Sequence, residues 1–155
     1  MNIPTRHGDI WREHERGAYV IVPVNLKGAF KAGVAADALK VSPGACRSYH
    51  AHIANGTHAG FVMIAHADRL IFFPTAHTQL DAQASLPLMR VAAGETLYRM
   101  RLGGMLAPLT YRLTVPVVSP LLGCGLGNLR WSAVSLVVTP LHDIGVSFIK
   151  HSSKS

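Results

Sequence analysis

The most distinctive motif of this chain is the glycine-rich segment Leu121-Leu122-Gly123-Cys124-Gly125-Leu126-Gly127-Asn128-Leu129-Arg130-Trp131. Glycine occupies every second position of its centre, at Gly123, Gly125 and Gly127. Glycine has no Cβ and tolerates a positive φ, so such a loop brings backbone N–H groups close to a bound phosphate. We therefore predict a diphosphate-binding loop, and a plain glycine-rich turn is the alternative.

The segment after this loop, residues 128–141, is predicted as a helix. The positive end of that helix would lie beside the loop amides and would favour an anion there.

The composition predicts one folded domain over residues 1–155, because 49% of the residues are hydrophobic and only 15% are charged. No apolar run reaches the ~18 residues of a membrane span, and residues 1–6 do not resemble a signal peptide. Cys46 and Cys124 are far apart and singly placed, which favours a reduced, cytoplasmic chain over a disulfide framework.

A formal net charge of +7 favours an anionic ligand or partner. The basic residues form no run, so a nucleic-acid-binding α/β domain is a third hypothesis that rests on charge alone.

The remaining segments predict alternating strands and helices. A β-branched run over residues 18–25 predicts a strand buried on both faces, followed by a loop and an alanine-rich helix over 34–40. A second helix is expected over 43–53, with Ser42 as N-cap and Pro43 at its first position. Residues 60–65 and 70–73 predict a hairpin, and residues 74–84 predict a polar connection.

The last third of the chain continues this alternation. Ser85 is expected to cap a helix over 86–102 that Gly103-Gly104 ends. Residues 111–118 and 145–150 predict two further strands. The order indicates an α/β domain with a mixed sheet between helices.

Taken together, three separated segments resemble the macrodomain family. They are Asp9 with the run Val22-Pro23-Val24-Asn25 through Gly28 to Gly33-Val34-Ala35, then Phe73-Pro74-Thr75, and then the loop Leu122–Trp131. More narrowly, the chain resembles the branch of the terminal ADP-ribose glycohydrolase and of the antitoxin that removes ADP-ribose from DNA. The resemblance implies a three-layer α/β/α fold with a central mixed sheet and an ADP-ribose cleft at the strand ends.

The resemblance also implies roles for residues near the amino terminus. Asp9, with Ile10 beside it, would accept the adenine amino group, as suits an acceptor-only carboxylate. The alternative is that Asp9 only caps the segment after it. Asn25 would hold the distal ribose, since its amide both donates and accepts hydrogen bonds.

The same comparison assigns Gly28, Gly33 and Val34 to a loop around the second phosphate and the ribose. Lys31 stands where the family has glycine, and it would contact a phosphate, partly fill the cleft, or remain a solvated loop lysine. Thr75 and Ala76 follow the next matching strand and are expected at the ligand.

The opening loop supplies the remaining ligand-binding residues that the resemblance implies. They are Gly123, Cys124, Gly125, Leu126, Gly127 and Asn128. Cys124 is expected to pack, because no adjacent base in the sequence activates it as a nucleophile. Trp131 is expected to pack the loop onto the core.

Two positions depart from the enzymes of this branch. Their catalytic lysine falls on Ala76 and their loop acid falls on Gly127. A methyl group and a hydrogen atom cannot attack a sugar carbon or act as a base, so the lysine-and-acid mechanism does not carry over.

Other side chains are candidates for catalysis without a lysine. His77 adjoins the vacant position and titrates near neutral pH, which makes it the candidate catalytic residue. Asp81 and Asp68 are further candidates that no spacing places in the cleft. The nine histidines show no metal-ligand spacing, so neither a metal nor a cofactor is expected.

The leading hypothesis is a module that binds ADP-ribose or an ADP-ribose-containing derivative, as a reader or by sequestering it. ADP-ribosylated protein or nucleic acid would be its partners, and no membrane is involved. The alternative is an ADP-ribosyl hydrolase, acting on protein, nucleic acid or ADP-ribose 1″-phosphate without a lysine.

Overall fold

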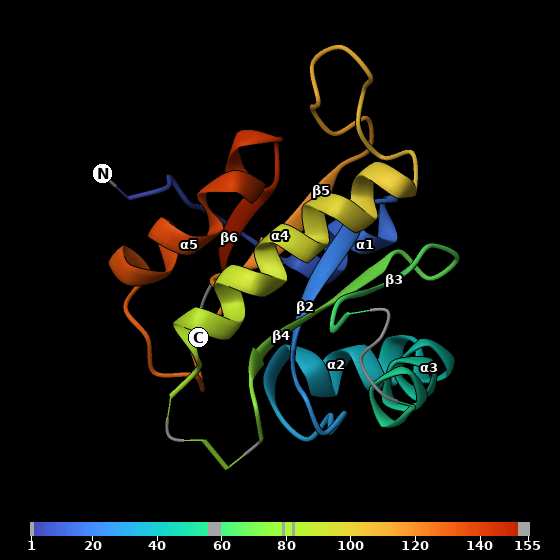
Figure 1. The fold of residues 1–155 in the computed structure, drawn as a ribbon, viewed down its shortest axis with the longest axis vertical. Helices are drawn as coiled ribbons and strands as arrows, with labels where there is room; N and C mark the ends of the chain where they lie inside the picture. Colours follow the sequence, from blue (N-terminus) through green and yellow to red (C-terminus); the bar gives the residue numbers. More distant parts are fainter. Residues whose placement is uncertain (1, 56–59, 79, 82, 152–155) are drawn as a thin grey trace.

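The computed structural model describes residues 2–55, 60–78, 80–81 and 83–151, and within them six strands form one mixed sheet (Figure 1). The sheet order is β1-β6-β5-β2-β4-β3, and β3 runs antiparallel to β4 while the other pairs are parallel. The strands are β1 Arg6–Gly8, β2 Tyr19–Asn25, β3 Met63–Ala65, β4 Leu70–Ala76, β5 Val117–Pro120 and β6 Ser147–His151. The parallel strands therefore end at one common edge.

Helices cover both faces of this sheet, as the three-layer α/β/α prediction requires. The helices are α1 Ile10–Glu15, α2 Gly33–Val41, α3 Pro43–Ala54, α4 Leu86–Leu102 and α5 Trp131–Asp143. Residues of α1, α2 and α3 share one buried cluster. Residues of α4 and α5 share the other, and Figure 1 shows α4 crossing in front of the sheet.

β2 contributes residues to both clusters, which confirms the strand predicted to be buried on both faces. Val20, Val22 and Val24 join the cluster with α1, α2 and α3, whereas Ile21 joins the cluster with α4 and α5. This division follows from the period-2 alternation of side chains along a strand.

The hairpin is present, but its two strands differ from the predicted lengths. β3 begins only at Met63, because the Glu95 carboxylate accepts hydrogen bonds from the N–H groups of Phe61 and Val62 at 2.7 and 3.1 Å. β4 extends through Ala76, so the predicted polar connection starts three residues too early. Of that predicted connection, residues 79 and 82 lie outside the described residues.

The strand predicted over residues 111–118 is wrong for most of its length. β5 contains only Val117–Pro120, and Leu113 forms an isolated bridge with Leu106. Tyr111 has a φ of 55°, which no strand residue adopts, and Pro116 has no N–H to donate to a neighbouring strand. These two residues turn the segment away from the sheet.

The helix predicted over residues 128–141 starts later than expected. Asn128 has a φ of 60°, so it cannot be helical, and α5 begins at Trp131. The Trp131 indole donates a hydrogen bond to the Ile3 carbonyl at 3.0 Å and packs against Phe148. The start of α5 is therefore tied to the core rather than to the glycine loop.

The two predicted N-caps behave differently. Ser85 accepts a hydrogen bond from the N–H of Leu88 at 3.2 Å and caps α4 as predicted. Ser42 occupies the N-cap position before Pro43, but its side chain makes no capping hydrogen bond. The backbone N–H of Ser42 instead donates to the Ala38 carbonyl at 2.8 Å and ends α2.

No helix among the described residues combines the length and the apolarity needed to cross a lipid bilayer.

The Tyr49 side chain on α3 is fully buried, and its hydroxyl is one of the buried polar groups without a partner in the described chain. Its ring stacks on Phe72 with 5.0 Å between centroids. Burial, together with the negative charge of Glu95, raises the pKa of this phenol. The ring therefore stabilises the fold by packing. The buried hydroxyl lowers the stability, because it has lost its hydrogen bonds to water and gained no partner.

We predict that Tyr49→Phe raises the free energy of unfolding by about 1 kcal/mol, because it removes the unpaired hydroxyl and keeps the ring. Phe72→Ala, the packing control, should lower it by about 3–5 kcal/mol. Urea denaturation of both variants measures the two changes. A stability loss in Tyr49→Phe would show that the hydroxyl has a partner.

Candidate functional site

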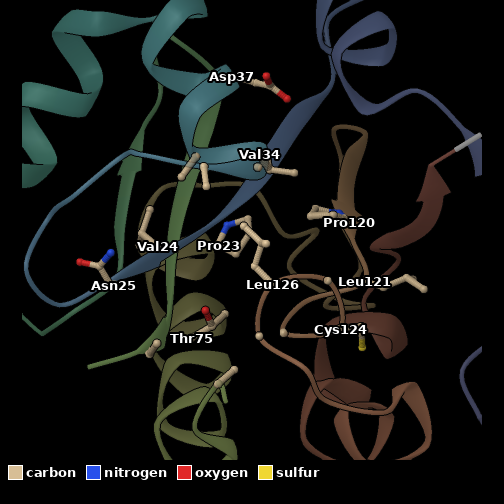
Figure 2. Close-up of a pocket in the computed structure, with 18 of the residues that line it drawn as sticks. Pro23, Val24, Asn25, Val34, Asp37, Thr75, Pro120, Leu121, Cys124 and Leu126 are labelled. Carbon is tan, nitrogen blue, oxygen red and sulfur yellow. The ribbon is translucent and has the colours of Figure 1, made fainter. Parts of the chain in front are cut away.

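A cavity of about 790 Å³ opens at the carboxyl edge of the sheet, where the sequence predicted the cleft (Figure 2). Its volume lies within the range of small-molecule sites, about 300–1,000 Å³. Its walls come from the ends of β2, β4 and β6 and from the loops after β2, β4 and β5, with α1 and α2 closing one end. The predicted residues that line it are Ile10, Asn25, Lys31, Gly33, Val34, Thr75, Ala76, Gly123, Cys124, Gly125, Leu126 and Gly127.

Asn25 shapes the loop between β2 and α2. Its Oδ1 accepts hydrogen bonds from the N–H groups of Lys27 and Ala29 at 3.0 and 3.3 Å, and its Nδ2 donates to the Ala29 carbonyl at 3.3 Å. The amide therefore holds the loop that it begins, and Asn25 itself lines the cavity. Gly28 shapes the same loop from behind, since a Cβ there would lie 2.8 Å from His50 Nδ1, and it does not line the cavity.

The amino end of α2 supplies backbone donors to the cavity. Ala32 occupies its N-cap position without a side-chain cap, and Gly33, Val34 and Ala35 line the cavity. The first N–H groups of a helix have no partner within it, and they lie at its positive end. The helix whose positive end lies at the cavity is thus α2. The sequence had predicted this role for the helix after the glycine loop, which is α5.

The glycine loop after β5 forms the opposite wall and is closed on itself. The Leu129 N–H donates to the Gly123 carbonyl at 2.8 Å, and the Ala84 N–H donates to the Gly127 carbonyl at 2.8 Å. Gly123 has a φ of +73°, which favours glycine. These bonds fix the loop against the start of α4.

The two walls approach each other through Leu126. A Cβ on Gly33 would lie 3.5 Å from Leu126 Cδ1, although 74% of Leu126 is exposed. In Figure 2 this side chain points from the glycine loop towards β2 and α2. Leu126 therefore narrows the cavity between the glycine loop and the amino end of α2.

Cys124 lines the cavity as an unactivated thiol. Its Sγ donates to the Leu122 carbonyl at 3.5 Å, and burial raises the pKa of the thiol to about 11. The thiolate is the nucleophilic form, and it is scarce at neutral pH with such a pKa. This agrees with the packing role expected for Cys124.

Solved structures of the same architecture cover almost the whole chain. The macrodomain of Mycobacterium tuberculosis DarG has a TM-score of 0.72 at 20% identity, over 99% of this chain and all of that one. The macrodomain of Thermus aquaticus DarG has a TM-score of 0.69 at 17% identity, over 97% of each chain. Thermosipho africanus DarTG in complex with ADP-ribose has a TM-score of 0.70 at 17% identity, over 93% of this chain and 39% of that one.

The chain has a macrodomain fold. No protein-family model and no curated protein matches its sequence. The macrodomain resemblance drawn from the sequence is thus confirmed by the architecture.

The sequence resemblance places the catalytic lysine of the related enzymes at Ala76, which ends β4. Ala76 lines the cavity there, and its carbonyl accepts a hydrogen bond from the Leu26 N–H at 3.1 Å. The Thr75 carbonyl accepts from the Ser85 N–H at 2.7 Å. These bonds hold the backbone at the end of β4, and the methyl group of Ala76 is not a nucleophile.

The sequence resemblance places the acid of the related enzymes at Gly127, where the loop leaves no room for a side chain. A Cβ on Gly127 would lie 2.6 Å from the Gly123 carbonyl oxygen and 2.9 Å from Gly123 Cα. Real Cβ atoms do not approach backbone atoms so closely, so any side chain there forces the loop to move. The missing acid is therefore part of how this loop packs.

The other candidate acids and bases either do not line the cavity or are held in a turn. His77 is exposed and does not line the cavity, and its backbone N–H donates to Asp81 Oδ2 at 2.9 Å. Asp81 lines the cavity, but hydrogen bonds from the Thr78 N–H and hydroxyl lower the pKa of its carboxyl and hold it in its own turn. Asp68 lies in the β3–β4 turn, at the other edge of the sheet.

Two other predicted ligand residues do not line the macrodomain cavity. Asp9 caps α1, since its Oδ1 accepts from the N–H groups of Trp11 and Arg12 at 3.0 and 3.4 Å. Asn128 provides the turn that follows the glycine loop. His58, one of the histidines considered for a metal, lies outside the described residues, and no group of three His, Cys, Asp or Glu side chains converges within them.

One end of the cavity was not predicted from the sequence. Trp11, Asp37 and the β6 residues Ile149, Lys150 and His151 line it. Asp9 followed by an amphipathic segment is an N-cap signal that points to α1, and α1 carries Trp11 to the cavity.

We predict that Gly127→Ala lowers the melting temperature by about 3–10 °C, because its methyl group overpacks the Gly123 backbone. Gly125→Ala is the matched control in the same loop, since a Cβ there meets nothing within 4 Å and φ is not positive. Differential scanning calorimetry compares the two variants. Equal melting temperatures would mean that the loop tolerates a side chain at Gly127.

Proposed function

We propose that this macrodomain-fold protein binds ADP-ribose, free or attached to a partner, as a reader or sequestering module. The observation that carries the proposal is the pair of backbone-lined walls facing one cavity, the amino end of α2 and the glycine loop. Backbone N–H groups at a helix start and in a glycine loop suit a diphosphate. A structural neighbour with this fold is a complex with ADP-ribose, which supports the choice of ligand.

In this proposal the diphosphate lies between Gly33-Val34 and residues 123–127. Lys31 lines the same wall as α2 and contributes a positive charge to the phosphates. The distal ribose lies over Thr75 and Ala76, where Asn25 offers its remaining amide hydrogen. The base lies at the end formed by α1, where Ile10 lines the cavity beside Asp9.

The partners we propose are ADP-ribosylated protein or nucleic acid. The formal net charge of +7 favours either a polyanion or a phosphate-bearing modification through long-range attraction. We place this function in the cytoplasm, since Cys46 and Cys124 are free thiols rather than a disulfide.

The residues at the end of β4 and in the glycine loop favour binding over hydrolysis. Ala76 has no reactive group, and Gly127 has no room for an acid. His77 does not line the cavity, and the Asp81 carboxylate is held in its own turn by the N–H groups of His77 and Thr78. A hydrolase would need a base positioned over the distal ribose, and these residues do not provide one.

We predict that ADP-ribose binds saturably at one site per chain and that Gly125→Glu weakens this binding about tenfold or more. A Cβ on Gly125 meets nothing within 4 Å, so the loop tolerates the side chain, but its charge repels the diphosphate. Isothermal titration calorimetry measures both affinities.

Two controls accompany this variant. Gly125→Gln adds a side chain of nearly the same size without the charge, so the difference between the two variants reports the charge alone, and its affinity should fall less than that of Gly125→Glu. Gly94→Glu adds the same charge on α4, where a Cβ also meets nothing within 4 Å and which does not line the cavity. Absence of ADP-ribose binding to the unmodified chain overturns the proposed function, and wild-type affinity in Gly125→Glu overturns the placement of the diphosphate.

We also predict no release of ADP-ribose from mono-ADP-ribosylated protein or DNA. Labelled substrates are incubated with the chain, with a lysine-bearing glycohydrolase as positive control, and free ADP-ribose is quantified. Release that disappears in both Asn25→Ala and His77→Ala would establish the hydrolase alternative instead.

A further inference from the structure

The loop between β2 and α2 has the cavity on one side and helix α3 on another. Ala29, Lys31 and Ala32 of this loop line the cavity, together with Asn25 at its start. Gly28 does not line the cavity and is buried against α3. The loop therefore presents groups to the ligand of the proposed function while a helix outside the cavity supports it.

His50 of α3 makes the polar contact that supports the loop. Its Nδ1 lies 3.2 Å from the Gly28 carbonyl oxygen. A carbonyl oxygen only accepts hydrogen bonds, so Nδ1 carries the hydrogen and donates it. Gly28 has a φ of +69°, and a Cβ there would lie 2.8 Å from His50 Nδ1 and 3.1 Å from His50 Cα. The loop can lie this close to α3 because Gly28 has no side chain.

The peptide that His50 holds is also bonded to Asn25. The Gly28 N–H donates to the Asn25 carbonyl at 3.2 Å. The Asn25 side chain bonds to Lys27 and Ala29, the residues on either side of Gly28. In Figure 2 the Asn25 side chain lies where this loop leaves β2. A shift of the Gly28 carbonyl would therefore displace the turn that holds the Asn25 amide.

Phe30 gives the loop a second, apolar anchor outside the cavity. Its ring meets Tyr49 of α3 edge to face with 6.2 Å between centroids, and it meets Phe72 of β4 in the same way at 5.9 Å. Apolar contact holds the loop onto the core without a strong directional preference. The hydrogen bond from His50 is directional, so it sets the orientation of one peptide group within the anchored loop.

We propose that His50 is a positioning residue for the part of the site that receives the distal ribose. It acts through the Gly28 carbonyl on the turn that holds Asn25, and it does not contact the ligand. This rests on the proposed function, which places the distal ribose at Asn25 and the diphosphate between α2 and the glycine loop. His50 therefore contributes more to the affinity for the distal ribose than to the affinity for the rest of the nucleotide.

The test compares ADP-ribose with ADP, which lacks the distal ribose. Isothermal titration calorimetry measures the affinity for ADP-ribose, and displacement of ADP-ribose measures the affinity for ADP. His50→Ala should weaken ADP-ribose about two- to tenfold, the range expected for one hydrogen bond between neutral groups, with ADP little changed. A general loss of stability would weaken both ligands alike and would leave the ratio of the two affinities unchanged.

His50→Asn and His50→Gln test the hydrogen bond itself. The Asn amide nitrogen is as many bonds from Cβ as Nδ1 is, so His50→Asn should keep most of the unmodified ratio. His50→Gln carries the same amide one bond further out, and its ratio should resemble that of His50→Ala. Helix propensity favours Gln over Asn, so it would act in the opposite direction.

His52→Ala is the matched control on the same helix. His52 Nε2 lies 2.9 Å from the Gly60 carbonyl oxygen, and neither residue lines the cavity. His50→Ala and His52→Ala each lose one hydrogen bond to a backbone carbonyl, so their melting temperatures should fall by similar amounts. Only His50→Ala should change the ratio.

The outcomes separate the two proposals. If ADP-ribose does not bind the unmodified chain, the proposed function fails and this inference fails with it. If ADP-ribose binds and His50→Ala keeps the unmodified ratio, the function stands and the positioning role of His50 is wrong. The role is also wrong if His50→Asn changes the ratio as much as His50→Ala does.

Discussion

The pairing of β2 with β4 is the constraint on which the site depends. Both strands are buried between two helical layers, and their parallel register shifts between Val24 and Asn25, so that Asn25 lies opposite Ala76. This shift brings the loop that Asn25 organises directly over the end of β4. A slip of one residue would exchange the two helical layers against which Val20, Ile21 and Val22 pack, and would move Asn25 away from Ala76. The packing of β2 between the two layers thus fixes the position of Asn25 at the strand end.

Much of the fold was predictable wherever local preference and tertiary packing agree. Residues 18–25 and 86–102 carry strong period and cap signals, and both elements appear almost as predicted. The failures are places where a single backbone angle or a distant partner decides. Tyr111 and Asn128 adopt a positive φ that their sequence context does not announce, and Glu95 replaces the sheet partners that β3 lacks at Phe61. Such contacts join residues far apart in the chain, so periodicity cannot reveal them.

The candidate site likewise combines parts that contiguous sequence predicts with parts that depend on contacts between distant segments. Motif resemblance located the glycine loop, the β2 loop and the end of β4, because these are contiguous segments with a recognisable order. The α1–α2–β6 end was missed because its residues come from three separate elements, and because Asp37 lies within an alanine-rich helix that looks like plain core. The choice between capping and ligand contact for Asp9 also needed coordinates, since either role uses the same carboxylate oxygens.

The packing of the glycine loop leaves no room for a side chain at Gly127. Gly127 packs against the Gly123 backbone, its carbonyl accepts from the Ala84 N–H, and Gly123 in turn accepts from Leu129. An acidic side chain at position 127 would open this ring of contacts and withdraw the backbone donors from the cavity. Within this backbone, the closed glycine loop and a side chain at position 127 exclude each other. In the proposed function, the same contacts hold the backbone donors of the loop at the diphosphate, and a lysine placed at Ala76 alone would have no acidic partner in the loop.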